Sequence, residues 1–241
     1  MSEIKLIKGD SMVEVPALQV GSIDLIIADA PYLIETTGGG GSVNAALKLD
    51  ESLKDLKNNQ DITEGYDIDA FADIVNTVQG GNINAYFWCN KAQIPDYFRA
   101  YVDRLGCKFD ILTWHKVYAL PTYSNKYLSD TEYCLYFHKG KGKTSPQSYD
   151  DAKTYWIEPI NHKDKKLYGH PTIKPLHMIE RLIRNSSKEG DTVLDCFMGS
   201  GRTGVSCVKL NRNFIGIEID DKYFAIAEER IKNAQMEQTL F

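Results

Sequence analysis

The chain has 241 residues, of which 43% are hydrophobic, so it is long enough to bury one substantial core. Its formal net charge is -5, and no apolar run reaches the roughly 18 residues that a membrane-spanning helix needs. The start, MSEIKLIKGD, is charged within its first five residues, which is not typical of a secretory signal, so we expect a cytoplasmic protein.

The cysteines indicate neither disulfides nor structural zinc. There are five, an odd number, with no C-x-x-C pair and no histidine at ligand spacing. We therefore expect no metal site, and we expect most of these cysteines to be small buried residues. They are Cys89, Cys107, Cys134, Cys196 and Cys207.

The charge is distributed unevenly along the chain. Residues 108–174 contain 11 lysines, no arginine and 7 acidic residues, a local balance of +4 that leaves -9 for the remainder. A basic segment in an acidic chain is compatible with a nucleic-acid partner, although a solvated lysine-rich surface is the more common meaning of such a bias.

Short apolar runs alternate with amphipathic stretches along the chain. In chain order, we predict strands at 4–7, 23–28, 84–88, 109–114, 132–137, 192–197 and 214–219. Helical spacing occurs between them, at 71–78, 95–105, 176–185, 202–210 and 222–233. Several strands are apolar throughout, which is typical of strands covered on both faces. The pattern predicts an α/β fold with a doubly wound, mostly parallel sheet.

Two segments interrupt this alternation within a single domain that we place at 1–241. Residues 35–65 combine TTGGGGS with a polar, charged run, and we expect a mobile loop there. Residues 140–168 mix lysines with tyrosines and a tryptophan, and we expect a loop-rich insert outside the sheet.

The stretch TVLDCFMGSGRTG combines a strand, a glycine turn and a helix. Its glycines match G-x-G-x-x-G, and Glu218 follows at the end of the next strand, 17 residues after Gly201. This layout favours an adenosine-containing cofactor at a helix N-terminus, with the acid on the ribose hydroxyls. Asp195 and Phe197 precede the turn, and a carboxylate there suits the ammonium and sulfonium of S-adenosylmethionine better than a pyrophosphate.

Three separated motifs resemble those of one family. DAPY at 29–32, HPTIKP at 170–175 and DCFMGSGRTG at 195–204 are similar to the motifs of amino-group DNA methyltransferases, in the β arrangement, where the catalytic motif comes first. Further likenesses extend over most of the chain, at 8–11, 86–91 and 129–140. The resemblance implies a Rossmann-like methyltransferase fold, S-adenosylmethionine as cofactor and double-stranded DNA as substrate.

The resemblance gives DAPY a catalytic role. An exocyclic amine is a poor nucleophile because its lone pair is delocalised into the ring. In the family, the first side chain and the second backbone carbonyl of the motif accept the hydrogens of the amine, which implies Asp29 and Ala30. Pro31 keeps Ala30 extended, and Tyr32 would stack on the base after it is flipped from the duplex. The family most often has proline in place of Ala30, so the ring that fixes φ is missing here.

The cofactor and DNA sites are implied in the same way. Glu218 would accept the ribose hydroxyls, Asp10 would meet the adenine, and Thr172 and Lys174 would lie near the methionine carboxylate. The full cofactor set is Asp10, Asp29, Thr172, Lys174, Asp195, Phe197, Gly199, Ser200, Gly201, Thr203 and Glu218. Residues 118–168 would form the target-recognition insert. Its DNA-binding lysines would be Lys139, Lys141, Lys143, Lys163, Lys165 and Lys166. A second copy of the chain and a restriction endonuclease are candidate partners.

The favoured activity is methylation of adenine N6, because cytosine-N4 members of the family more often open the motif with serine where this chain has Asp29. Three alternatives remain open: a cytosine-N4 methyltransferase, a nicotinamide-dependent oxidoreductase with the same glycine pattern, and a catalytically silent nucleic-acid-binding relative. Only one strand and one helix follow the glycine turn and its helix, which argues against the oxidoreductase.

Overall fold

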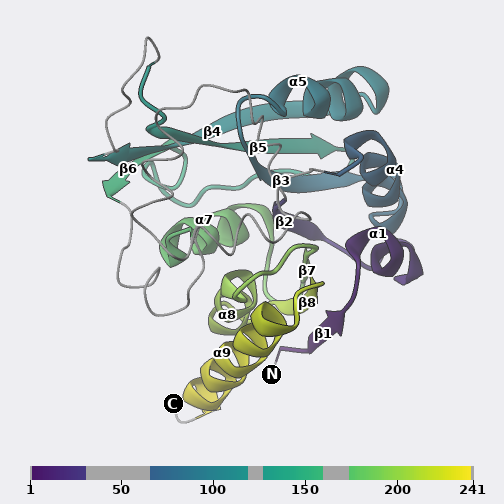
Figure 1. The fold of residues 1–241 in the computed structure, drawn as a ribbon, viewed down its shortest axis with the longest axis vertical. Coiled ribbons are helices and arrows are strands. Elements are labelled where there is room, and N and C mark those ends of the chain that lie inside the picture. Colours follow the sequence, from purple (N-terminus) through teal and green to yellow (C-terminus); the bar gives the residue numbers. More distant parts are fainter. Residues whose placement is uncertain (1, 31–65, 119–126, 160–173, 240–241) are drawn as a thin grey trace, which may run out of the picture.

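The computed structural model describes residues 2–30, 66–118, 127–159 and 174–239, which form one eight-stranded sheet with helices on both faces (Figure 1). The strand order is β1-β8-β7-β2-β3-β5-β4-β6. The strands are β1 (Ile4–Lys8), β2 (Leu25–Asp29), β3 (Ile83–Cys89), β4 (Lys108–Val117), β5 (Thr131–Lys139), β6 (Tyr155–Pro159), β7 (Thr192–Asp195) and β8 (Asn213–Glu218). All seven predicted strands are confirmed, as β1, β2, β3, β4, β5, β7 and β8.

Five of the seven strand pairings are parallel, so the predicted doubly wound, mostly parallel sheet is confirmed. The exception is β5, which runs antiparallel to both of its neighbours, β3 and β4. The central strands are apolar because both of their faces are covered: every residue of β3, INAYFWC, is buried.

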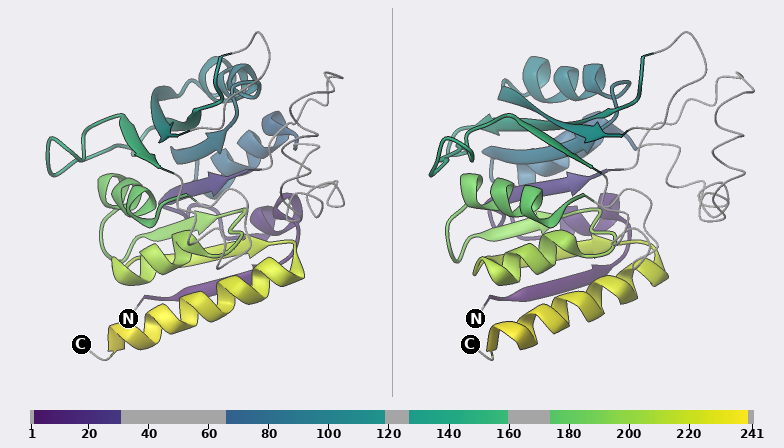
Figure 2. Two further views of the ribbon diagram at one scale, coloured as in Figure 1. Left: turned by 60° about the vertical axis from the view of Figure 1, so that its left-hand side comes forward. Right: turned by 90° about the vertical axis from the view of Figure 1, so that its left-hand side faces the viewer.

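The helices form a layer on each face of the sheet (Figure 2). The helical segments are α1 (Ser11–Glu14), η1 (Val15–Ala17), α4 (Ile68–Val78), α5 (Ile94–Tyr97), the π-helical η3 (Phe98–Arg104), α7 (Leu176–Ser186), α8 (Arg202–Lys209) and α9 (Asp221–Thr239). One hydrophobic core joins the sheet to α4, α5 and η3. A second core joins the opposite face to α7, α8 and α9. None of the described helices is long and apolar enough to cross a membrane.

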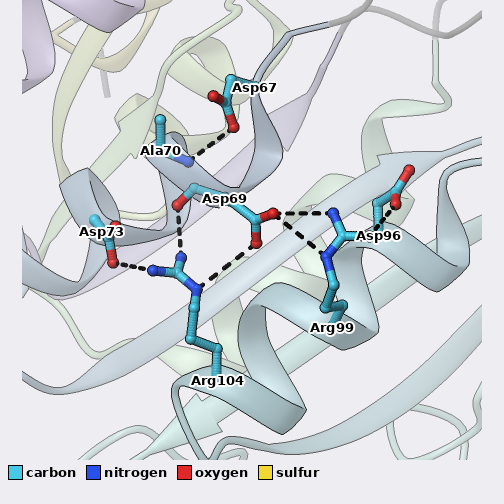
Figure 3. A network of polar contacts seen from close by, with 7 residues as sticks. All are labelled: Asp67, Asp69, Ala70, Asp73, Asp96, Arg99 and Arg104. Atoms are coloured by element: carbon cyan, nitrogen blue, oxygen red, sulfur yellow. Dashed lines mark hydrogen bonds and ion pairs between the residues drawn. The ribbon is translucent and has the colours of Figure 1, made fainter.

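Helix α4 illustrates how the sequence positions one of these layers. Asp67 caps its N-terminus by accepting a hydrogen bond from the backbone N–H of Ala70 at 3.0 Å. The apolar side chains recur at helical spacing, so one face of the helix is buried. On the other side, Asp69 and Asp73 of α4 pair with Arg99 and Arg104 of η3 (Figure 3). This exposed network ties α4 to η3 above the sheet.

Two parts of the chain differ from the sequence predictions. Residues 155–159, expected in a loop-rich insert outside the sheet, form the edge strand β6. Trp156 is buried against Trp88 of β3, and burial of this ring places the segment on the sheet. The short helices α1 and η1 were not predicted, since four and three residues are too few for helical periodicity to be visible. Residues 35–65 lie outside the described residues.

Candidate active site

The site lies at the carboxyl ends of β2 and β7, where the helical connections change from one face of the sheet to the other. β2 and β7 are neighbouring parallel strands. β2 leads through α4, on one face, to β3, whereas β7 leads through α8, on the opposite face, to β8. Ligands of doubly wound sheets bind in the crevice that opens at the carboxyl ends of the strands at such a point. Asp29 ends β2 and Asp195 ends β7, so the structure brings these two carboxyl groups to the same crevice.

A cavity occupies this crevice. Its polar and charged lining comes from the ends of β2 and β7, the glycine turn and the segment before α7, and its apolar floor comes from both cores. The lining residues are Ile27, Asp29, Trp88, Lys174, Ile179, Asp195, Phe197, Met198, Gly199, Ser200, Arg202 and Thr203. Seven predicted cofactor residues therefore lie together here: Asp29, Lys174, Asp195, Phe197, Gly199, Ser200 and Thr203.

Asp195 is buried at the base of this cavity. Its carboxylate accepts hydrogen bonds from the Thr203 hydroxyl at 2.6 Å and from the Phe197 backbone N–H at 3.1 Å. Burial raises the pKa of Asp195 to about 7, although both hydrogen bonds lower it. A cation placed in the cavity would favour the ionised form, so this carboxyl group is poised to respond to a positively charged ligand.

The glycine turn brings backbone close to the cavity. Gly199 and Gly201 have φ of 51° and 78°, in the left-handed region that favours glycine. A Cβ on Gly201 would lie 2.9 Å from the Cα of Ala227 in α9, so the close packing of α8 on α9 also requires glycine there. The turn ends at the N-terminus of α8, where backbone N–H groups point toward the cavity end of the helix.

Glu218 and Asp10 flank the cavity without lining it. The Glu218 carboxylate accepts backbone hydrogen bonds from Gly199 and Asp220, each at 2.8 Å, and burial raises its pKa. Each carboxylate oxygen has two lone pairs, so these bonds leave acceptor capacity. Asp10 caps α1 by accepting from the Met12 N–H at 2.8 Å, and the neighbouring Gly9 N–H bonds the Glu218 carbonyl. The two acids therefore lie at adjacent strand ends.

Asp29 takes part in a chain of alternating charges. The Lys174 ammonium lies 2.7 Å from Asp29 Oδ2 and 3.0 Å from Glu132 Oε2. The first contact is a hydrogen bond, and the second is an ion pair. The other oxygen of Glu132 contacts Lys116. Sequence reasoning placed Lys174 beside a methionine carboxylate, but the structure places its ammonium between two carboxylates of the protein.

Aromatic rings complete the walls. Trp88 lies beneath the Lys174 ammonium, 5.1 Å from its ring centroid. Phe197 packs against Tyr66 and Phe71, which extends the first core up to the cavity. Ala30, which follows Asp29, is buried.

Several predicted residues are not brought to this site. Lys139 pairs with Ile83, the first residue of β3, whereas the Asp29 partner is Trp88, near the end of the same strand. Because β5 is antiparallel to β3, it carries Lys139, and Lys141 and Lys143 after it, toward the amino end of β3. Asp29 lies at the carboxyl end of β3, about 20 Å away along the strand. Other predicted residues lie outside the described residues: Pro31, Tyr32, Lys163, Lys165, Lys166 and Thr172.

Sequence reasoning missed three residues of the site. Glu132 is the acidic residue within the predicted strand 132–137, and a charge at the start of a buried strand was a usable signal. Arg202 is buried although it interrupts the glycine turn with a charge, which was also visible. Trp88 carried no such signal, since an aromatic residue in an apolar strand is ordinarily part of the core.

The arrangement combines a hydrogen-bond acceptor with a cavity suited to a cationic ligand. Asp29 can accept a hydrogen bond from a group that enters above β2. The cavity beside it is lined by Asp195, by residues of the glycine turn and by Arg202, so it can bind a molecule that carries both positive and negative charge. The geometry therefore supports transfer of a group from such a molecule to a substrate held at Asp29.

Comparisons with known proteins give a consistent result. A family model described as DNA methylase, for N6/N4 methyltransferases, matches residues 23–229. The chain is 29% identical over 241 residues to the type II methyltransferase M2.DpnII of Streptococcus pneumoniae, which covers 94% of this chain and 89% of that protein. It is 27% identical over 247 residues to M2.LlaDCHI of Lactococcus lactis subsp. cremoris, with 94% and 88% covered. Among solved structures, the M1.HpyAVI–SAM complex matches with a TM-score of 0.64 and 26% identity, over 95% of this chain and 100% of that chain.

Proposed function

Since the chain belongs to the N6/N4 family of DNA methylases, we propose that it transfers a methyl group from S-adenosylmethionine to the N6 amino group of adenine in double-stranded DNA. The observation that carries this proposal is the position of Asp29. Its carboxylate ends a central strand, lines the cavity at the carboxyl ends of β2 and β7 and is held by Lys174. The aspartate that opens the motif favours adenine over cytosine.

Asp29 and Ala30 would activate the amine. The Asp29 carboxylate would accept one hydrogen of the amino group and the Ala30 carbonyl the other, which turns the nitrogen lone pair toward the methyl donor. Positive charge develops on the nitrogen as it is methylated, and the nearby carboxylate stabilises that charge. We propose that Pro31 keeps Ala30 extended and that Tyr32 stacks on the flipped base.

The cavity residues fit S-adenosylmethionine, which supplies a methyl group on a positively charged sulfur. Asp195 would meet its positive charge, and the glycine turn, with Phe197, Ser200 and Thr203, would surround it. Glu218 would accept the ribose hydroxyls and Asp10 would lie on the adenine side. Lys174 and Arg202 both line the cavity and are our candidates for the methionine carboxylate. Thr172 stays a proposed contact.

DNA would approach the edge of the sheet at which Asp29 lies. Lys163, Lys165 and Lys166, within the proposed insert 118–168 of a single domain 1–241, remain our candidates for phosphate contacts. β5 carries Lys139 to the other end of the strands, so any contact that Lys139, Lys141 and Lys143 make with DNA would lie away from Asp29. A cytoplasmic location, a homodimer and a restriction endonuclease partner belong to the same proposal.

The first test replaces Asp29 with asparagine. We expect Asp29→Asn to lower kcat by about 10²-fold or more, because the transition state loses a charged acceptor. Binding of S-adenosylmethionine, measured by calorimetry, should persist. The matched control is Asp24→Asn, at the opposite end of the same strand, which should keep its activity. Near-normal methylation by Asp29→Asn would remove this role from the residue.

The second test identifies the product. Genomic DNA treated with the protein and labelled cofactor is digested to nucleosides, which are separated chromatographically. Label in N6-methyladenine is expected. Label in N4-methylcytosine would replace adenine by cytosine as the substrate, and no label in any base would overturn the proposed function itself.

A further inference from the structure

Four charged side chains from four separate segments form a continuous row of ion pairs that ends at Asp29. In order they are Lys116 of β4, Glu132 of β5, Lys174 before α7 and Asp29 of β2. The signs alternate, so their formal charges sum to zero. Lys116 and Glu132 do not line the cavity, and the mechanism above assigns them nothing.

Burial makes these contacts strong. The Lys174 side chain is only 3% exposed and that of Glu132 14%. Burial by itself would raise the pKa of Glu132, but the charges of Lys174 and Lys116 outweigh it and lower the pKa below its usual range. Glu132 is therefore ionised at neutral pH, and two carboxylates share the single charge of Lys174.

This sharing has a consequence for Asp29. If Lys174 paired with Asp29 alone, its full positive charge would act on the carboxylate that must attract the hydrogens of the amine. Glu132 draws the ammonium from the other side and offsets part of that charge at Asp29. Lys116 in turn attracts Glu132 and limits how far it can draw Lys174 away. The charge felt at Asp29 thus depends on all three side chains behind it.

We propose that Glu132 and Lys116 are positioning residues for methyl transfer, which divide the charge of Lys174 between two carboxylates and so set the strength of Asp29 as a hydrogen-bond acceptor. The inference rests on the proposed function, because it refers to the step in which Asp29 holds the amine. It adds two residues that touch neither the cofactor cavity nor Asp29 itself.

Other titratable groups near Asp29 do not supply this effect. Burial raises the pKa of the Cys89 thiol to about 12 and also raises the pKa of the Cys134 thiol, so both are neutral at physiological pH. Asp195 faces Asp29 across the cavity, and its charge interacts with that carboxylate. Asp195 is unchanged in sequence in both variants, so it does not by itself produce shifts of opposite sign.

The test measures kcat against pH for two variants with opposite expected shifts. Glu132→Gln keeps the shape but removes the negative charge, so less of the Lys174 charge is offset at Asp29 and protonation of Asp29 becomes harder. The acid limb of the profile should move to lower pH, and kcat on the plateau should fall by about 10-fold, because Asp29 becomes a weaker acceptor for the charge that develops in the transition state. KM for DNA and for the cofactor should change little.

Lys116→Met removes the cation behind Glu132, so Glu132 draws Lys174 more strongly and Asp29 is protonated more readily. Its acid limb should move to higher pH. A purely structural role for these residues would not produce shifts of opposite sign. If Glu132→Gln does not fold, the shift in Lys116→Met still decides the question, since an unmoved or lowered limb would contradict the proposal.

The matched control is Asp69→Asn in the exposed network of Figure 3, because Asp69 also contacts two cations, Arg99 and Arg104. It should leave both kcat and the acid limb unchanged. Wild-type values for Glu132→Gln in a protein that methylates DNA would overturn the inference and leave the proposed function intact. Absence of methylation by the wild type itself would instead overturn the proposed function.

Discussion

Two ion-pair networks of similar composition lie in different surroundings. The network between α4 and η3 joins three aspartates to Arg99 and Arg104 (Figure 3), and the Arg99 side chain is 56% exposed. The network at the end of β2 joins two carboxylates to two lysines, and Lys174 is almost completely buried. The contacts have comparable lengths. Burial, and not the number or length of the contacts, separates them.

The comparison teaches what each network can do. Water screens the exposed charges, so ion pairs of that kind contribute little to stability. The buried charges have lost their hydration and depend on one another, so removal of one leaves another uncompensated. The exposed network is suited to holding two helices together, whereas the buried one can transmit a change of charge to Asp29.

The largest effect should come from breaking the buried network at its centre. Lys174→Met leaves the Asp29 and Glu132 carboxylates without their common cation. We expect the free energy of unfolding, measured with urea, to fall by about 3 to 5 kcal/mol, together with loss of methylation. An unchanged free energy of unfolding would contradict the expectation that the buried carboxylates depend on Lys174 for compensation of their charge.

Asp195 extends the comparison to a buried carboxyl group whose hydrogen-bond partners are neutral. The pKa of Asp195 is raised from 3.8 to about 7, so between these values the folded protein holds a proton that the unfolded chain has released. The stability of the cofactor-free protein should therefore decrease as pH rises from about 4 to about 7. Asp195→Asn should flatten this dependence in thermal melts across that range, with Glu218, whose pKa is also raised, retaining part of it. An undiminished slope in Asp195→Asn would assign the dependence to other groups.

The smallest effect should come from the exposed network. In Arg99→Gln the pairs with Asp69 and Asp96 are lost, but water replaces them readily. We expect a slight lowering of the melting temperature at low salt that disappears at high salt, because salt screens the exposed charges. A large decrease that persists in high salt would mean that exposure does not distinguish the two networks.

Much of the architecture could be predicted from the sequence because it depends on local patterns. The seven predicted strands and the five helical regions are present, and the family resemblance is confirmed by the match to the DNA methylases, which removes the oxidoreductase alternative. β6 was not predicted, because its surroundings in sequence are polar. Trp156, the residue that attaches it to the sheet, finds its partners Trp88 and Arg181 only in the fold.

The direction of β5 was also beyond the sequence. The pattern of buried residues in a strand is the same whether it runs parallel or antiparallel to its neighbour. That direction decides that Lys139 lies at the opposite edge from Asp29, and it also decides that Glu132, at the other end of β5, lies beside Lys174. The direction of one strand therefore places Lys139 far from Asp29 and brings Glu132 to Lys174.

The sequence by itself determined the sheet, the glycine turn and the identity of Asp29 and Asp195, because strand and turn formation follow from the residues within each segment. Only the tertiary structure decided which charges meet. Lys174 is 145 residues from Asp29 along the chain and 42 from Glu132, yet its ammonium contacts both. Such contacts depend on the order and direction of the strands, which are set by packing of the two cores over the whole sheet and not by any single segment.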